Sequence, residues 1–312
     1  MLFLKAIAFF SFTMLWCSSA VAKNVVTTTP ILQELYQKVT CQSNVEVQTL
    51  VGRSEDPHGF QMTPSKRRVL SSAAHVLAVG LGTEPWLRSL RSSVKKRSLA
   101  LGDSLYDSHA HLVNLTEVNG SKGGHGSHHH HHEGEDDPHF FHSPKLVLKT
   151  LDIISKWVTK ENLQNPGVTK DCVNKAKEHY KKALKEVEEI FSAIPNNERK
   201  IILKHQFLGQ FADDFNFKVL QLAGFSSQER VSPKRLRKVL REAKREKAFA
   251  VFVEKGESRK TVSAFLEQDG AVFGGELWAD NLGEKSGEAG DIVKMWTSNA
   301  SIIVKTLKTV KK

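Results

Sequence analysis

The longest uninterrupted helical pattern in the chain covers residues 168–194, VTKDCVNKAKEHYKKALKEVEEIFSAI. This segment contains no proline or glycine, and apolar residues recur at helical spacing from Cys172 to Ile194, with lysines and glutamates between them. At a rise of 1.5 Å per residue, about 25 residues of such a helix span about 38 Å, the width of a domain. We therefore predict one long, rigid connecting helix, with bounds 166–194.

Strands and helices alternate on both sides of this segment. We predict strands at 24–28, 45–51, 76–80, 200–204, 217–222, 248–253 and 271–274, and helices at 30–39, 64–74, 144–158, 209–215, 233–246, 258–268 and 290–307. Alternation of this kind is typical of βα units with a parallel sheet. The predicted fold class is α/β, with two lobes, 23–165 and 195–312, whose parallel-type sheets are joined by the long helix.

The first 22 residues have the pattern of a secretory signal peptide. Lys5 precedes an apolar core at 6–16, and Ala20-Val21-Ala22 supplies small residues for cleavage. Cys17 follows the bulky Trp16, which argues against a lipid-modified cysteine. We expect residues 1–22 to be removed and the mature protein to be periplasmic.

Net charge and cysteine content bear on the expected partners and on disulfide formation. The formal net charge is +11, but the basic residues are spread over helix faces such as 234–247, without the interleaved aromatic residues of a nucleic-acid platform. We therefore expect no nucleic-acid partner. We also expect the protein to be a monomer. Cys41 and Cys172 are the two cysteines left after cleavage. An oxidising compartment permits a bridge between them, but the sequence leaves their pairing open.

Residues 114–137 interrupt the alternation with glycine, serine, histidine and acidic residues. With so few apolar residues, this insertion cannot form a packed core, so we expect a surface loop. Five of the chain's 14 histidines form the run His128, His129, His130, His131 and His132, and His125 lies just before it. Imidazole is the commonest metal ligand in proteins, so this density predicts auxiliary metal capture by these histidines and by His142 just beyond them.

Four further residues are candidate metal ligands because each lies just beyond a predicted strand or at the entry to a helix. They are His58, His139, His205 and Asp280. Ligands of open α/β sheets bind outside the carboxyl ends of the strands, so two facing lobes would bring the four together. His58 and His139 each end an Asp-Pro-His tripeptide, whose aspartate can accept a nearby N–H group. His142 is an alternative to His139, and Glu276 competes with Asp280.

These motifs resemble those of a known family. Residues 55–60 and 63–65, EDPHGF and TPS, resemble the first metal motif of the zinc- and manganese-binding receptors of bacterial ABC importers. Residues 137–140 resemble the second motif, 205–211 the third and 277–280 the fourth, and the preceding insertion resembles the histidine-rich loop of zinc-specific members. The resemblance covers essentially the whole mature chain.

The resemblance implies two α/β lobes with a metal ion buried between them, and His58, His139, His205 and Asp280 as its ligands. Manganese receptors of the family tend to have a carboxylate at the third position, where this chain has His205. Three imidazoles and one carboxylate suit Zn²⁺, with Mn²⁺ as the alternative. The implied function is capture of Zn²⁺ for an ABC permease and its ATPase, with no enzyme activity.

Two other functions stay open. A secreted metal buffer or adhesin would keep the histidine-rich insertion but would need no permease. A zinc hydrolase would need a vacant coordination position and a general base beside the metal. The chain has no His-Glu-x-x-His motif, and four protein ligands would leave no vacancy, so the hydrolase is the weakest alternative.

Overall fold

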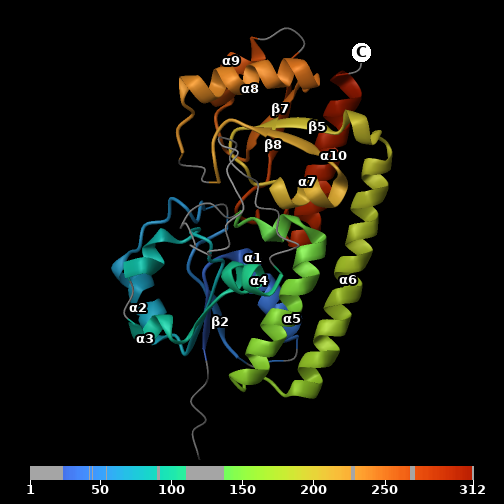
Figure 1. Cartoon of the computed structure of the whole chain (residues 1–312). Coiled ribbons are helices and arrows are strands. Elements are labelled where there is room, and N and C mark those ends of the chain that lie inside the picture. Colours follow the sequence, from blue (N-terminus) through green and yellow to red (C-terminus); the bar gives the residue numbers. More distant parts are fainter. Residues whose placement is uncertain are drawn as a thin grey trace, which may run out of the picture.

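Two sheets of parallel strands, one in each half of the molecule, and one long helix that runs beside both halves form the frame of the protein (Figure 1). The structure, a computed structural model, describes residues 24–310 apart from residues 42, 44, 54, 90–91, 110–136, 226–228 and 268–270. The first sheet has the strand order β2-β1-β3-β4 and the second β6-β5-β7-β8, with every pairing parallel. We call the parts that carry these sheets the N-lobe and the C-lobe. The predicted α/β fold class is confirmed.

The elements of the two lobes follow one another in βα order. The strands are β1 Val25–Thr27, β2 Val47–Thr49, β3 His75–Ala78, β4 Ser98–Ala100, β5 Lys200–Leu203, β6 Lys218–Gln221, β7 Ala250–Glu254 and β8 Val272–Leu277. The α-helices are α1 Pro30–Val39, α2 Pro64–Ser72, α3 Ser92–Lys95, α4 Leu101–His109, α5 Pro144–Lys160, α6 Pro166–Ser192, α7 Gly209–Phe215, α8 Pro233–Glu246, α9 Ser263–Leu266 and α10 Ile292–Val310. Four short 3₁₀ turns complete the list: η1 Pro85–Ser89, η2 Phe140–His142, η3 Asn196–Glu198 and η4 Arg259–Val262.

Local sequence fixes where several helices begin. Proline occupies the first turn of α1, α5 and α8, where its missing N–H costs nothing and its fixed φ suits a helix. The residue before each proline is a hydroxyl N-cap: Thr29, Ser143 and Ser232 accept a hydrogen bond from a first-turn N–H group.

The long helix α6 runs along one side of both lobes (Figure 1). Its buried stripe includes Val173, Ala176, Tyr180 and Val187, and it packs against α1 and α5 of the N-lobe and against α10. Because α6 packs against helices of both lobes along its length, it stabilises the arrangement of the two lobes and is not an isolated linker.

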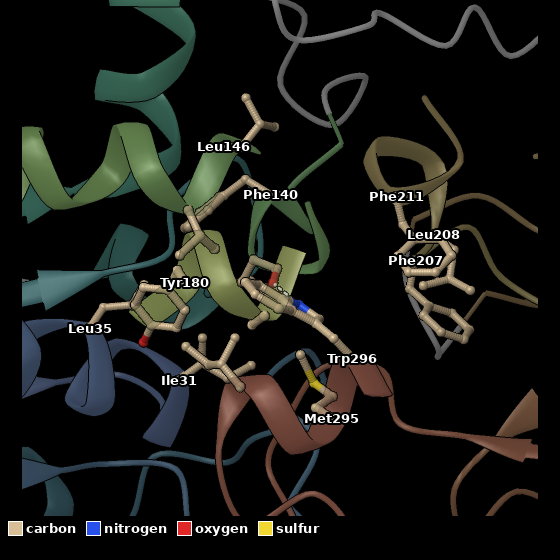
Figure 2. Packing of buried hydrophobic residues seen from close by; sticks show 14 of the residues in the cluster. Ile31, Leu35, Phe140, Leu146, Tyr180, Phe207, Leu208, Phe211, Met295 and Trp296 are labelled. Carbon is tan, nitrogen blue, oxygen red and sulfur yellow. Dashed lines mark hydrogen bonds between the residues drawn. The ribbon is translucent and has the colours of Figure 1, made fainter. Parts of the chain in front are cut away.

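One hydrophobic cluster extends through both lobes. Figure 2 shows Ile31 and Leu35 of α1 beside Met295 and Trp296 of α10, with the C-lobe residues Phe207, Leu208 and Phe211 further along. All of these side chains are buried. Two smaller clusters each lie within one lobe, and that of the N-lobe includes Val26, Leu50 and Val76. The lobes therefore share their main core.

A disulfide joins Cys41 to Cys172, which answers the question that the sequence left open. Cys41 follows the end of α1, and Cys172 lies in α6. The bridge therefore ties the first helix of the N-lobe covalently to the long helix.

The sequence prediction differs from the structure in several places. It missed β4 and α4, because β4 is only three residues long and its sequence, Ser-Leu-Ala, has no β-branched residue. It predicted one helix at 258–268, where the structure has the short turns η4 and α9; Thr261, Val262 and Ser263 are weak helix formers at this junction. It also ended β8 too early, at residue 274.

Candidate metal centre

The loops beyond the strand ends of the two lobes meet at one buried place. In each sheet the chain moves first to one side of the opening strand and then to the other, which creates a crevice at the carboxyl ends. His58 follows β2, His205 follows β5 and Asp280 follows β8, while His139 immediately precedes η2. The four predicted candidates are therefore brought together from four separate connections.

Asp280 lies at the centre of this group. Its Oδ1 atom is 2.8 Å from His139 Nε2 and 3.7 Å from His58 Nε2, and its Oδ2 atom is 3.7 Å from His205 Nε2. The imidazole centroids are 6.1 Å apart for His58 and His139 and 5.6 Å apart for His139 and His205. His139 is 1% exposed, His205 0% and Asp280 7%. The donor atoms thus converge in a site almost closed to solvent.

The converging atoms lack ordinary hydrogen-bond partners. The buried Nε2 atoms of all three histidines and both carboxylate oxygens of Asp280 make no hydrogen bond of good geometry among the described residues. Buried polar atoms are usually satisfied, and leaving several together without partners is costly. A divalent cation would satisfy all of them at once, so the donor set fits a metal ion.

Asp137 holds His139 in place. One of its oxygens, Oδ1, accepts from His139 Nδ1 at 2.8 Å and from the His139 backbone N–H at 3.0 Å, which directs Nε2 at Asp280. A Cβ atom at Gly209 of the C-lobe would lie 2.5 Å from Asp137 Oδ2. The absence of a side chain at the start of α7 is therefore needed for this carboxylate to approach.

The pKa values of His139 and Asp280 reflect their pairing. Burial alone lowers the pKa of His139, but the charges of Asp280 and Asp137 outweigh it and raise this pKa to about 10. Burial alone would raise the pKa of Asp280, yet His139 holds it well below its usual range. The metal-free site therefore keeps a proton on His139, and a bound cation would take the place of that positive charge.

His205 is supported from a neighbouring strand. Its Nδ1 atom lies 2.5 Å from Oε1 of Glu254, the last residue of β7, which pairs with β5. Glu254 and Asp280 flank the imidazole, and these three residues form a second group with metal-binding geometry beside that of His58, His139 and Asp280. A carboxylate beside Nδ1 leaves Nε2 as the nitrogen available to a metal ion.

The two alternative ligands lie outside this geometry. His142 is fully buried and its Nε2–H donates to the backbone oxygen of Ala279 at 2.9 Å. Burial first, and then the charge of His139, lowers the pKa of His142 to about 3, so it stays neutral as a packed residue. Glu276 accepts from the backbone N–H of Gly256 and lies 3.7 Å from Lys255 Nζ. Among the described residues, neither belongs to a metal-compatible group.

Some predicted residues cannot be compared with the structure. The signal peptide at 1–22 and the histidines of the insertion, His125 and His128 to His132, lie outside the described residues.

Sequence reasoning also missed supporting residues. Glu254 lies just beyond the predicted strand 248–253, the kind of position that was used to select ligand candidates, so the same criterion could have found it. Glu84 is buried near His58, and it accepts from Thr28 Oγ1 at 2.5 Å and from the backbone N–H groups of Val79 and Gly80. Burial raises the pKa of Glu84. Because Thr28 follows β1 and Val79 follows β3, this carboxylate ties together the strand ends beneath the site.

The protein has the two-lobe α/β fold of solute-binding proteins, and its structural neighbours include periplasmic metal-binding proteins. It aligns with a manganese-bound periplasmic metal-binding protein from Candidatus Liberibacter asiaticus at a TM-score of 0.73 and 21% identity, over 91% of this chain and 99% of the other. Residues 25–306 match the family described as zinc-uptake complex component A, periplasmic. The chain therefore belongs to this family, whose members are metal-binding receptors of ABC transporters.

Two relatives carry names that refer to different metals. The manganese-binding lipoprotein MntA of Bacillus subtilis is 25% identical over 85% of this chain and 83% of its own length. The zinc-binding protein TroA of Treponema pallidum is 24% identical over 91% of this chain and 88% of its own. Within the described residues, no helix combines the length and apolar character required to cross a bilayer.

Proposed function

We propose that this receptor captures Zn²⁺ between its lobes with His58, His139, His205 and Asp280 as ligands, and delivers it to a membrane permease. The observation that carries the proposal is the convergence of three imidazole Nε2 atoms on one buried carboxylate, without satisfying hydrogen bonds among them. Binding, and not catalysis, suits a site in which each donor faces the others and little solvent enters.

The donor set favours zinc over manganese. Zn²⁺ is commonly bound by a tetrahedral set of imidazole nitrogens and carboxylate oxygens, whereas Mn²⁺ prefers more oxygen. Three nitrogen donors and a single carboxylate therefore point to Zn²⁺, although the relatives include proteins named for either metal. Mn²⁺ is the competing cargo.

Membership of the family supports a proposal for the partners of the protein and for its compartment. An ABC permease with its ATPase is the proposed destination of the metal, and the periplasm is the proposed compartment. We further propose that His125 and His128 to His132 add weak, fast-exchanging sites that concentrate metal near the main one.

Competitive calorimetry with Zn²⁺ and Mn²⁺ tests the proposal. The mature protein should show one tight zinc site that survives deletion of residues 120–135 and disappears in His205→Ala. His179→Ala is the matched control, because His179 is an exposed histidine of α6 and belongs to neither metal-compatible group among the described residues. Manganese should bind the same site more weakly.

The opposite pattern would identify a histidine-rich metal buffer. In that case tight binding would vanish with residues 120–135, while His205→Ala would bind zinc as well as the unmodified protein. Manganese binding more tightly than zinc would instead overturn the choice of metal.

A further inference from the structure

The four proposed ligands are not attached equally to the rest of the molecule. His205 and Asp280 belong to the C-lobe, and the turn that carries His139 is packed against it. Trp296 Nε1–H of α10 donates to the backbone oxygen of Phe141, and His142 donates to that of Ala279. The shared core includes Phe140 and Phe141 together with C-lobe residues.

The start of α5, just after this turn, is also held by the C-lobe. Asp214 at the end of α7 accepts from Ser143 Oγ at 2.7 Å and from the Lys145 backbone N–H at 3.2 Å. A carboxylate of the C-lobe thus caps a helix of the N-lobe. His139, His205 and Asp280 therefore lie on one continuous packed unit.

His58 lies on a loop with a different attachment. Leu50, which precedes this loop, belongs to the separate N-lobe cluster, whose members all come from β1 through α3. The loop is braced within the N-lobe: Lys66 Nζ donates to the Leu50 oxygen, and Gly52 N–H donates to Glu55 Oε2 at 2.7 Å. Asp56 Oδ1 accepts from the His58 N–H at 2.8 Å. Because these bonds lie within the N-lobe, they would persist if the loop that carries His58 moved away from the C-lobe.

Hydrogen bonds of Asn281 and Arg53 connect this loop to the C-lobe. The amide nitrogen of Asn281, the residue after Asp280, donates to the backbone oxygens of Gly52 and Glu55 at 2.6 and 2.7 Å. In the opposite direction, Arg53 Nη1 donates to the backbone oxygens of Gly283 and Gly290 at 2.5 and 3.0 Å. Such hydrogen bonds are individually modest and exchange with water, unlike a shared apolar core.

We propose that Asn281 and Arg53 are positioning residues that hold His58 over the metal site, so that His58 is the ligand that leaves first when metal is exchanged. The inference rests on the proposed function, because it assigns a movement to one of the proposed ligands. His139 cannot take this role, since moving it would break the shared core.

Stopped-flow kinetics with Zn²⁺ alone test the proposal. The zinc-loaded protein is mixed with excess chromogenic chelator to measure release, and the metal-free protein is mixed with Zn²⁺ to measure capture. Asn281→Ala and Arg53→Ala should each accelerate release about tenfold or more, because each removes two hydrogen bonds between the loop of His58 and the C-lobe. Capture should be as fast as in the unmodified protein, or faster. A merely displaced Asp280 would instead slow capture.

Arg235→Ala is the matched control. Arg235 also donates its guanidinium N–H groups to a backbone oxygen, that of Gln221, but this contact lies entirely within the C-lobe. Its release rate should equal that of the unmodified protein, and thermal unfolding without metal checks that all variants are folded.

The outcomes separate this proposal from the proposed function. Unchanged release in both Asn281→Ala and Arg53→Ala, with tight zinc binding by the unmodified protein, would overturn the positioning role and leave the receptor function intact. Slower capture in both variants would also overturn it. An unmodified protein that retains no zinc would overturn the function itself, and the positioning role with it.

Discussion

The sheets of the two lobes have the same topology, but the two lobes position their histidines differently. Each sheet places its strands in the same order and sends loops from the carboxyl ends toward the shared site. In the N-lobe, Asp56 and Asp137 lie two residues before His58 and His139 and bond to their backbone N–H groups. In the C-lobe, His205 relies on Glu254, which is distant in sequence and adjacent only because β7 pairs with β5.

The N-lobe histidines are therefore positioned by residues close to them in the sequence, and His205 is positioned by a contact that depends on the tertiary structure. A tripeptide that braces its own histidine needs only a correct turn, whereas the contact between His205 and Glu254 exists only when the sheet has formed. We therefore expect the C-lobe half of the site to depend on the folded sheet, and the N-lobe half to depend on how its loops are held against the C-lobe.

The largest expected effect comes from removing a proposed ligand. His139→Ala should weaken zinc binding by more than the roughly 10- to 100-fold that loss of an outer partner costs, because its Nε2 is buried and closest to Asp280. His58→Ala should cost less, since water can replace a ligand carried by the more loosely attached loop. Calorimetry measures both affinities. Equal losses, or a larger loss in His58→Ala, would contradict this order.

Loss of the disulfide should affect the lobes unequally. Replacing Cys41 and Cys172 by serine should lower the free energy of unfolding by about 2–5 kcal/mol, since the bridge closes a long loop. Hydrogen exchange should speed up mainly in α1 and β1 to β3. A similar increase in β5 to β7 would show that the shared core transmits the loss to the whole molecule.

Removing the outer carboxylates compares the two kinds of support directly. Asp137→Ala and Glu254→Ala should each weaken zinc binding about 10- to 100-fold. Asp137→Ala should be the more severe, because Asp137 also holds the His139 backbone. Asp152→Ala is the control, as Asp152 pairs with Lys177 between α5 and α6. A harmless Glu254→Ala would mean that the sheet positions His205 without help.

The smallest effect concerns His142, where the N-lobe turn rests on the C-lobe. Its pKa is lowered to about 3 in the folded protein, against 6.5 in the unfolded chain, so the unfolded state binds more protons as the pH falls below 6.5. The associated stability is complete above pH 6.5 and is lost toward pH 3. By pH 5 the metal-free protein should lose about 2 kcal/mol through this residue.

His142→Gln provides the comparison, since glutamine retains an N–H donor for the Ala279 oxygen but does not titrate. Denaturant unfolding at pH 7 and pH 5 should show a smaller loss in the variant. Equal losses in both proteins would assign the acid sensitivity to other groups.

Much of the fold could be predicted because its signals are local. The bounds of α1 and α7 were predicted as observed, since a proline or glycine marks where each helix begins. The residues that meet at the site were found by their positions: His58, His205 and Asp280 lie beyond a strand, and His139 lies at the entry to a helix. The proposal that they bind metal remains to be tested by experiment.

The missing parts are those created by tertiary structure. Arg53 and Asn281 lie in no motif, and their acceptors are backbone oxygens more than 200 residues away. The demand for glycine at residue 209 arises only when Asp137 of the other lobe approaches it. Local patterns carry no information about such contacts.

The disulfide also sets an order of maturation. Cys172 comes later in the chain than every strand of the N-lobe and later than both His58 and His139, so the first lobe cannot be closed covalently until the beginning of α6 has been delivered to an oxidising compartment. The C-lobe contains no cysteine. A chain that crosses a membrane from its N-terminus would therefore complete its first lobe only when the connecting helix follows it, whereas no disulfide has to form within its second lobe.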